Sequence, residues 1–217
     1  YGANYGTLQT KFRNADGTFN YGMIQDINEQ SEHGSMLVMG KLKNYHNWYG
    51  LVSTYNTKIG KDFDFYGGVD FRAYKGVHTN EILDLYNGKY YIDSSRQNAK
   101  AVNNVNASNP DWVNEKLGVG DVMYRDYDGH VVQEGAFFQT EYTKSDLSAF
   151  IAGSLSNTSY WRYDRLYYDK KHAESKTKSY IGFTVKGGAN YNINEHHNVF
   201  FNAGYISRAP MFNNVFL

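Results

Sequence analysis

The chain of 217 residues contains no cysteine and only two prolines, and its 22 basic residues are balanced by 22 acidic ones. The absence of cysteine excludes a disulfide scaffold, a zinc site with cysteine ligands and a thiol nucleophile, but it leaves the cellular compartment open. A net charge of zero removes the electrostatic reason to expect a nucleic-acid partner. Aromatic residues and glycine are abundant instead, with 21 tyrosines, 13 phenylalanines and 21 glycines.

Long hydrophobic runs are also missing. Apolar runs such as Met36–Met39 fall far below the roughly 18 residues that a membrane-spanning helix needs. The chain opens at Tyr1 without the basic region and apolar core of a secretory signal, so we expect a fragment or a processed chain. A helical membrane protein is not expected. A β-barrel stays open, because its strands alternate and keep the mean hydropathy low.

Apolar and polar residues alternate with a period of two over several stretches, which is the pattern of β-strands. From Phe63 to Ala73 every second residue is Phe, Gly, Val or Ala, and aspartate, arginine and tyrosine lie among the residues between them. The alternation recurs over residues 147–158, 181–191 and 198–208, and more weakly over 47–56 and 131–142. Strands of about 10 to 13 residues exceed those usual in globular sheets and suit a tilted crossing of a hydrocarbon layer.

The connections between these strands are of two kinds. Short turns rich in Asn, Asp, Gly, Lys or Glu are predicted at residues 57–62, 143–146 and 192–197. Long loops are predicted at about 1–44, 76–130 and 161–179, so short and long connections alternate. We therefore predict an all-β fold: an antiparallel up-and-down meander that is part of a transmembrane β-barrel, with short turns on one rim and long loops on the other.

Short helices are expected inside the long loops. Residues 109–118 carry an N-cap asparagine, a proline in the first turn and a terminal glycine, which together predict a helix. Further short helices are predicted over 80–86 and 21–30, and Asn14–Gly17 is predicted to form a turn.

Short motifs along the strands resemble a known family. The segment Gly187–Phe201, followed by Gly204–Pro210, resembles the middle of the barrel of TonB-dependent outer-membrane receptors. Its residues Ser207, Arg208, Ala209 and Pro210 are similar to the Phe-Arg-Ala-Pro of that family, with serine in place of the aromatic residue. Proline cannot donate to a strand ladder, so this motif is interpreted as a strand end.

Other segments look like the branch of the family found in glycan-degrading Gram-negative gut anaerobes. They are Trp48–Asn56, Gly118–Asp121 and Tyr124–Gly129. The resemblance covers most of the chain from about residue 45 onward.

The resemblance implies a 22-stranded barrel with an N-terminal plug that imports siderophores, cobalamin or glycans, using energy delivered through TonB. Because the chain shows neither plug nor TonB box and has about six to eight strands, we expect residues 1–217 to be a partial barrel from inside the parent receptor. The implied location is the cell outer membrane. The implied partners are outer-membrane lipid, TonB through the missing N-terminal part, a surface lipoprotein, and a small-molecule or glycan ligand. No enzymatic activity and no cofactor are expected.

Aromatic residues in the long loops are the candidate ligand contacts, because aromatic faces stack on sugar rings or flat chelates and carry a polar tip. The alternative for any of them is an aromatic girdle at the membrane interface, and this applies most to the last two members of the set. The set consists of Tyr86, Tyr90, Tyr91, Trp112, Trp161 and Tyr163.

No metal or catalytic site is predicted. The stretch Asp126–Gly129 with Glu134 has the alternating acids of a calcium loop, but the closing acid falls one residue out of place and no helix pair flanks it, so we interpret it as a turn leading into a strand. Two alternatives to the receptor stay open. One is a soluble or surface β-rich carbohydrate-binding or adhesive module, and the other is an outer-membrane enzyme using Asp128 and His130.

Overall fold

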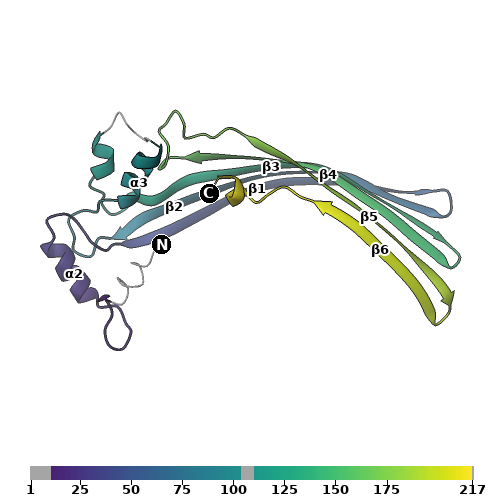
Figure 1. Ribbon diagram of the computed structural model, residues 1–217, viewed down its shortest axis with the longest axis horizontal. Coiled ribbons are helices and arrows are strands. Elements are labelled where there is room, and N and C mark those ends of the chain that lie inside the picture. Colours follow the sequence, from purple (N-terminus) through teal and green to yellow (C-terminus); the bar gives the residue numbers. More distant parts are fainter. Residues whose placement is uncertain (1–10, 104–109, 217) are drawn as a thin grey trace. The chain divides into compact units, whose positions relative to one another are not determined.

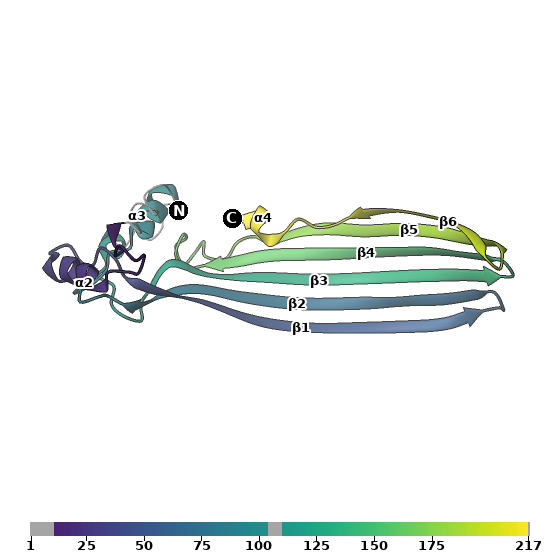
Figure 2. The same ribbon diagram turned by 90° about the horizontal axis from the view of Figure 1, so that it is seen from below.

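The computed structural model describes residues 11–103 and 110–216. Six antiparallel strands form one open sheet in which each strand pairs with its neighbours in sequence (Figure 2). The predicted all-β, up-and-down meander is therefore confirmed. The strands are β1 (Met39–Ile59), β2 (Phe63–Asp84), β3 (Val122–Lys144), β4 (Leu147–Asp164), β5 (Lys178–Asn194) and β6 (His197–Ser207).

Helices occupy the connections and the end of the chain (Figure 1). The helix predicted over 21–30 is confirmed, and the side chain of Asn20 caps it by accepting a hydrogen bond from the Met23 N–H at 3.0 Å. None of the helices in the described part of the chain is long and apolar enough to cross a membrane. The helices are α2 (Tyr21–Gln30), α3 (Ser94–Asn103), the 3₁₀ helix η1 (Pro110–Asn114) and α4 (Phe212–Phe216).

Two of the predicted helices differ from the structure. The helix predicted over 80–86 is wrong, because β2 continues to Asp84: the Ile82 N–H donates to the Asp121 carbonyl at 2.9 Å, and the buried Ile82 side chain belongs to a hydrophobic cluster. The helix predicted over 109–118 is shortened to the single 3₁₀ turn η1, and its predicted cap, Asn109, lies outside the described residues.

The strands extend further into the predicted long loops than the alternation indicates. Among the described residues the long loops span 11–38, 85–121 and 165–177. The predicted loops were longer: they reached residue 44 and covered 76–130 and 161–179. The reason is that polar and apolar residues no longer alternate where a strand end is covered: Ile82 on β2 and Asp128 on β3 are both fully buried. The short turns at 60–62, 145–146 and 195–196 lie where they were predicted.

The chain divides into two compact units. The loop unit comprises residues up to 45, 77–128 and 163–174, and the strand unit comprises 46–76, 129–162 and 175–217. The loop unit is built around a hydrophobic cluster of four buried side chains, with Val38 and Leu85 packed against it. The cluster consists of Ile82, Tyr91, Leu117 and Met123.

A buried asparagine ties α2 to this core. The Asn28 side-chain amide donates to the carbonyls of Leu37 and Leu85 at 2.7 and 3.0 Å, and its oxygen accepts from the Met36 N–H at 2.9 Å. Buried polar groups are tolerated when their hydrogen bonds are satisfied, so Asn28 positions the helix against the ends of β1 and β2.

The strand unit has one apolar and one polar face, and the register of β4, β5 and β6 shows them directly. Directly paired residues of antiparallel strands share a face. The apolar face carries the rows Leu147–Tyr191–Val199, Ala149–Ala189–Phe201, Ile151–Gly187–Ala203 and Gly153–Val185–Tyr205. The polar face carries Ser148–Asn190–Phe200, Phe150–Gly188–Asn202, Ala152–Lys186–Gly204 and Ser154–Thr184–Ile206.

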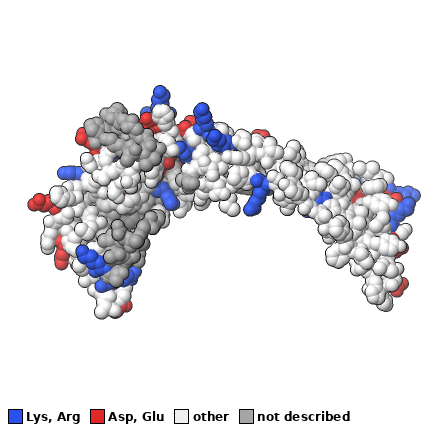
Figure 3. Space-filling model, viewed as in Figure 1, with Lys and Arg blue, Asp and Glu red and all other residues white. Residues whose placement is uncertain are grey.

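Large side chains of the apolar face are exposed. Val185, Ile151 and Tyr205 keep 52%, 53% and 65% of their surface accessible. Few charged side chains are visible over the strands in Figure 3, which views the sheet from its edge and not onto either face. Soluble monomers rarely expose an apolar patch that continues over several strands, and such patches are typical of interaction surfaces.

The end of the chain folds back onto the polar face. β6 ends at Ser207, and the Tyr160 hydroxyl donates to the Pro210 carbonyl at 2.8 Å. In α4 the Phe212 ring packs edge-on against Tyr160, with 6.1 Å between ring centroids. The interpretation of Ser207–Pro210 as a strand end is confirmed.

Candidate functional site

A pocket of about 220 Å³ lies in the loop unit. Segments far apart in sequence form its walls: α3, η1, the start of β3 and the loop that follows β4. Three carboxylates, two guanidinium groups and one indole line it, together with aliphatic side chains. The lining residues are Arg96, Trp112, Glu115, Leu117, Asp121, Val122, Asp126, Arg165 and Leu166.

Arg96 on α3 organises one side of the pocket. Its guanidinium lies over the Trp112 ring at 5.2 Å from the centroid and forms an ion pair with Glu115. It also donates to the carbonyls of Trp112 at 3.2 Å and Val122 at 3.4 Å. Arg96 is only 8% exposed, and its Nε is a buried donor that has no partner among the residues described.

Asp93 holds α3 against β3 next to this arginine. The carboxylate is fully buried; one oxygen accepts from the Ser95 N–H at 2.9 Å and from the Ser95 hydroxyl, and the other accepts from the Tyr124 N–H at 2.8 Å. Asp93 therefore caps α3 and satisfies a backbone donor of β3 where Tyr124 has a positive φ of 60°. The position of Arg96, in the first turn of α3, depends on this anchor.

Asp93→Ala is expected to loosen α3 and η1 while leaving the strands folded. Losing a cap and leaving the Tyr124 N–H unsatisfied should cost about 1–3 kcal/mol of local stability. Limited trypsin digestion of the full-length protein checks this, with faster cleavage expected at Lys89 and Lys116. Asp84→Ala, which removes only the acceptor of the Tyr86 N–H in an exposed turn, is the control and should digest like the wild type.

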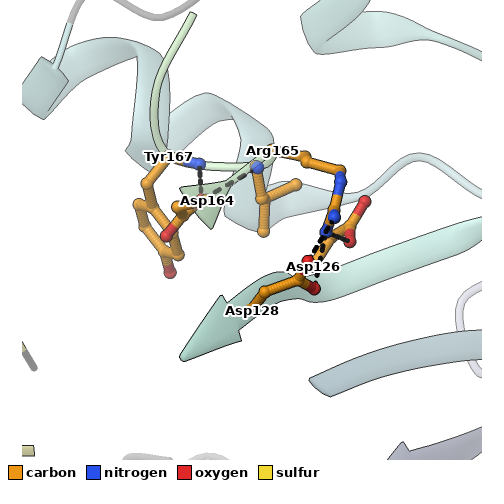
Figure 4. A network of polar contacts seen from close by, with 6 residues as sticks. Asp126, Asp128, Asp164, Arg165 and Tyr167 are labelled. Carbon is orange, nitrogen blue, oxygen red and sulfur yellow. Dashed lines mark hydrogen bonds and ion pairs between the residues drawn. The ribbon is translucent and has the colours of Figure 1, made fainter. Parts of the chain in front are cut away.

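On the opposite side of the pocket, Arg165 joins the β4–β5 loop to β3 (Figure 4). Its guanidinium donates to Asp126 at 2.9 Å and to both oxygens of Asp128, at 3.1 and 2.8 Å. The Arg165 backbone N–H donates to the Asp126 carbonyl at 2.9 Å. The Asp128 side chain is only 3% exposed, whereas that of Arg165 is 41% exposed. A partly exposed arginine therefore neutralises a buried carboxylate.

The charges of this cluster shift the ionisation of its members. The hydrogen bond that the Arg165 guanidinium donates to Asp128 raises the pKa of Arg165, which stays protonated. Burial raises the pKa of the Asp126 carboxyl, and the opposing attraction of Arg165 is the smaller effect. Arg165 therefore interacts more strongly with Asp128 than with Asp126.

Asp164 shapes the loop that carries Arg165. One of its carboxylate oxygens accepts from the backbone N–H groups of Leu166 at 2.9 Å and Tyr167 at 2.7 Å (Figure 4). Its own N–H donates to the Ala173 carbonyl at 2.9 Å. Leu166 and Ala173 are buried at 4% and 2% exposure. The β4–β5 loop is therefore held by its own hydrogen bonds and a small apolar base.

Of the six aromatic residues predicted to contact a ligand, the structure brings one into the pocket. Trp112 lines the wall beside Arg96 and Glu115. Tyr90 lies elsewhere in the loop unit: its hydroxyl donates to the Glu32 carbonyl at 2.9 Å, and the Lys116 ammonium lies over its ring. Tyr86 follows β2 in a turn with a positive φ of 47° and packs near Tyr21.

Tyr91 is a core residue. It is 7% exposed within the hydrophobic cluster, its hydroxyl is hydrogen-bonded to that of Tyr124, and burial raises its pKa.

The remaining two aromatic residues lie at the end of β4. Trp161 stacks on the His130 ring at 4.8 Å with an interplanar angle of 8°, and the Arg165 guanidinium lies over Tyr163. Neither lines the pocket.

The acidic stretch at Asp126–Gly129 is part of β3, so its interpretation as a turn is wrong. Pairing with the neighbouring strands keeps the segment extended, and Arg165 occupies both carboxylates. Within residues 11–103 and 110–216, no group of three or more acidic, histidine or cysteine side chains could hold a metal ion. The alternative hypothesis of an outer-membrane enzyme uses Asp128 and His130. In the structure Asp128 is bound by Arg165, and His130 is stacked on Trp161.

Sequence reasoning did not find Arg96, Glu115 or Arg165. The nearest signal was the spacing of Asp126 and Asp128, whose partner is 37 residues or more away along the chain. In comparisons with known proteins, no family model and no curated protein sequence matches this chain.

Proposed function

We propose that this chain is a segment of the barrel wall of a TonB-dependent outer-membrane receptor, which captures an extracellular nutrient and imports it. The observation that carries the proposal is the two-faced sheet of the strand unit. Exposed apolar rows run in register across β4, β5 and β6. The rows of the other face consist of Ser, Thr, Asn, Lys and small residues together with Phe150, Phe200 and Ile206. Outward apolar and inward polar residues alternate in this way in transmembrane barrels.

The length of the strands supports the proposal. Fourteen consecutive residue pairs, from Leu147–Tyr191 to Tyr160–Lys178, join β4 to β5. At about 3.3 Å per residue the pairing extends over roughly 45 Å, which spans a hydrocarbon core of about 30 Å even at a tilt of about 45°. We assign the membrane crossing to the strand unit and the water-exposed, ligand-facing side to the loop unit.

The connections agree with the same assignment. The turns after β1, β3 and β5 have two or three residues, whereas the β2–β3 and β4–β5 connections are long and contain the pocket. Short turns on one rim and long loops on the other are typical of outer-membrane barrels, where the long loops face outward. In the parent receptor the bare edges of β1 and β6 pair with further strands of the barrel, because an open edge invites aggregation.

The partners follow from this role. Outer-membrane lipid covers the apolar face, TonB acts through the N-terminal part of the parent receptor, and a surface lipoprotein is a candidate partner of the long loops. The protein is proposed to act without enzymatic activity and without a cofactor.

Fractionation of cells that produce the full-length protein tests the proposal. We expect the protein in the outer membrane, extractable only with detergent, and migrating faster on gels before heating than after. A full-length protein that is soluble in the periplasm or the medium would contradict the receptor and favour the soluble carbohydrate-binding or adhesive module. Hydrolytic activity that disappears in a His130→Ala variant would instead support the enzyme.

A further inference from the structure

We propose that residues 208–216 form a strap inside the barrel, which covers the inner wall at Gly129 and narrows the interior there. This inference rests on the proposed receptor function, because that function makes the polar face of the sheet the inner wall. It is carried by the path of the strap, by the seat of the Phe212 ring and by the burial of the wall beneath it. All of these contacts lie within the strand unit.

The strap leaves β6 and crosses onto the polar face of the sheet. β6 ends at Ser207, and the Pro210 carbonyl then accepts a hydrogen bond from the Tyr160 hydroxyl on β4 at 2.8 Å. Tyr160 lies on the polar face, because an even number of residues separates it from Ser154 on the same strand. Since β5 lies between β6 and β4 in the sheet, the chain passes over β5 on this face.

The strap reaches β3, where Gly129 provides a seat for the Phe212 ring. A Cβ atom at Gly129 would lie 3.0 Å from the tip of that ring, which is closer than an ordinary contact. A glycine in a strand often marks such a close approach. The ring also packs edge-on against Tyr160, and in α4 it lies 5.1 Å from the Phe216 ring. Phe212 is therefore held by two neighbouring strands of the proposed inner wall.

The wall beneath the strap is buried. Tyr160 and Arg162 keep only 7% and 8% of their surface accessible, and the Arg162 guanidinium lies over the Phe216 ring at 6.0 Å. On the same face, Phe200 and Ile206 of β6 each keep 70% accessible. The strap thus takes up space that is otherwise open to the interior.

Few contacts hold the strap in place. α4 has only five residues, and a single helical turn is not stable without tertiary contacts. Met211, beside the ring that fills the seat, stays 67% exposed. The Phe212 ring and the hydrogen bond from Tyr160 to Pro210 are therefore the anchors whose removal we expect to release the strap.

The experiment measures access to position 129 in the full-length receptor, freed of other cysteines, in outer membranes. Gly129→Cys is the reporter, because the tip of the Phe212 ring has to give by only a few tenths of an ångström and still covers the sulfur. Two water-soluble maleimides are compared, a small one and a bulky one that carries a polyethylene glycol chain. Adding Phe212→Ala is expected to speed labelling roughly tenfold, and to do so more for the bulky reagent than for the small one. Phe200→Ala removes a phenylalanine from the same face of β6 and is the matched control, which should leave both rates unchanged.

Each outcome decides the inference. Labelling that Phe212→Ala leaves unchanged would overturn the strap, and an equal rise with Phe200→Ala would show a general loosening of the wall instead. An equal rise for both reagents would overturn the narrowing.

A second variant covers the case in which Phe212→Ala does not reach the outer membrane. Tyr160→Phe keeps the ring and removes only the hydrogen bond to Pro210, so labelling should rise about threefold. No rise in this variant would then overturn the strap. All of these results leave the receptor function standing, because that is decided by membrane location.

Discussion

Val185→Arg is expected to reduce sharply the amount of folded receptor in the outer membrane, whereas Thr184→Arg is not. Val185 lies near the middle of β5 on the apolar face, where it pairs with Gly153 and Tyr205. An arginine on the lipid face near the bilayer midplane costs about 2–4 kcal/mol, and a residue facing the lumen is spared this cost. The two variants differ by one position along the strand and carry the same new charge.

The measurement is the folded fraction in outer membranes, followed by urea titration of the purified receptor in lipid vesicles. We expect the unfolding midpoint of Val185→Arg to fall and that of Thr184→Arg to stay near wild type. Equal destabilisation by the two variants would show that both faces of the strand meet the same environment, and the assignment of a lipid face would then be wrong.

Arg165→Met is expected to open the β4–β5 loop. The substitution keeps most of the side-chain volume but leaves the nearly fully buried Asp128 carboxylate without its arginine. Breaking a buried ion pair costs about 3–5 kcal/mol, and partial exposure of Arg165 reduces this to roughly 2–3 kcal/mol. Amide hydrogen exchange reports the opening, with protection of the Asp164 and Arg165 N–H groups falling about 30- to 150-fold.

Two controls separate the lost ion pair from the lost side chain. Lys170→Met removes an exposed cation from the same loop and should leave exchange unchanged. Arg165→Met combined with Asp128→Asn removes both charges and should recover part of the lost protection. If the double variant exchanges as fast as Arg165→Met, the loss of Arg165 from the Asp128 charge is not the cause of the opening.

The two aspartates that bind Arg165 are expected to respond differently to loss of charge. Asp128→Asn should destabilise the loop at neutral pH, because it removes the negative charge and replaces one of the two oxygens that accept from Arg165 by an NH₂ donor. Asp126→Asn should be close to neutral, because burial raises the pKa of Asp126 despite the nearby arginine. A carboxyl with a raised pKa in the folded state binds its proton more readily there, so its contribution to stability increases as the pH falls through that pKa.

Hydrogen exchange of the β4–β5 loop between pH 7 and pH 4, corrected for the intrinsic exchange rate, measures whether the contribution of Asp126 to stability increases as the pH falls. Wild type should gain protection from Asp126 as the pH falls, and Asp126→Asn should not show that gain. A wild type and an Asp126→Asn variant with parallel pH profiles would contradict it.

The strand unit could be predicted from sequence because its signal is local. Apolar and polar residues alternate over 181–191 on β5, and their partners on β4 and β6 alternate in phase with them. The two faces of each strand can therefore be predicted from its own sequence. The turn at 195–196 is encoded in the same way by Asn194, whose side chain accepts from the His196 N–H.

The loop unit could not be predicted in this way. Residues 80–84 look helical in isolation, but Ile82 is held in β2 by the Asp121 carbonyl and by its place in the core, which are contacts made across the chain. Tyr91 and Trp112 look alike as loop aromatics, yet one is buried in that core and the other lines the pocket. The difference is set by Leu117 and Arg96, which lie close to them only in the folded chain.

The most direct test of the barrel wall uses the absence of cysteine from these 217 residues. Single cysteines are placed in turn at positions 181 to 187 on β5 of the full-length receptor, freed of any other cysteine, and outer membranes are treated with a water-soluble maleimide. The proposed wall predicts labelling at 182, 184 and 186, which face the polar side, and protection at 181, 183, 185 and 187, which face lipid. Uniform labelling along the strand would contradict a lipid-covered face, and with it the proposed barrel.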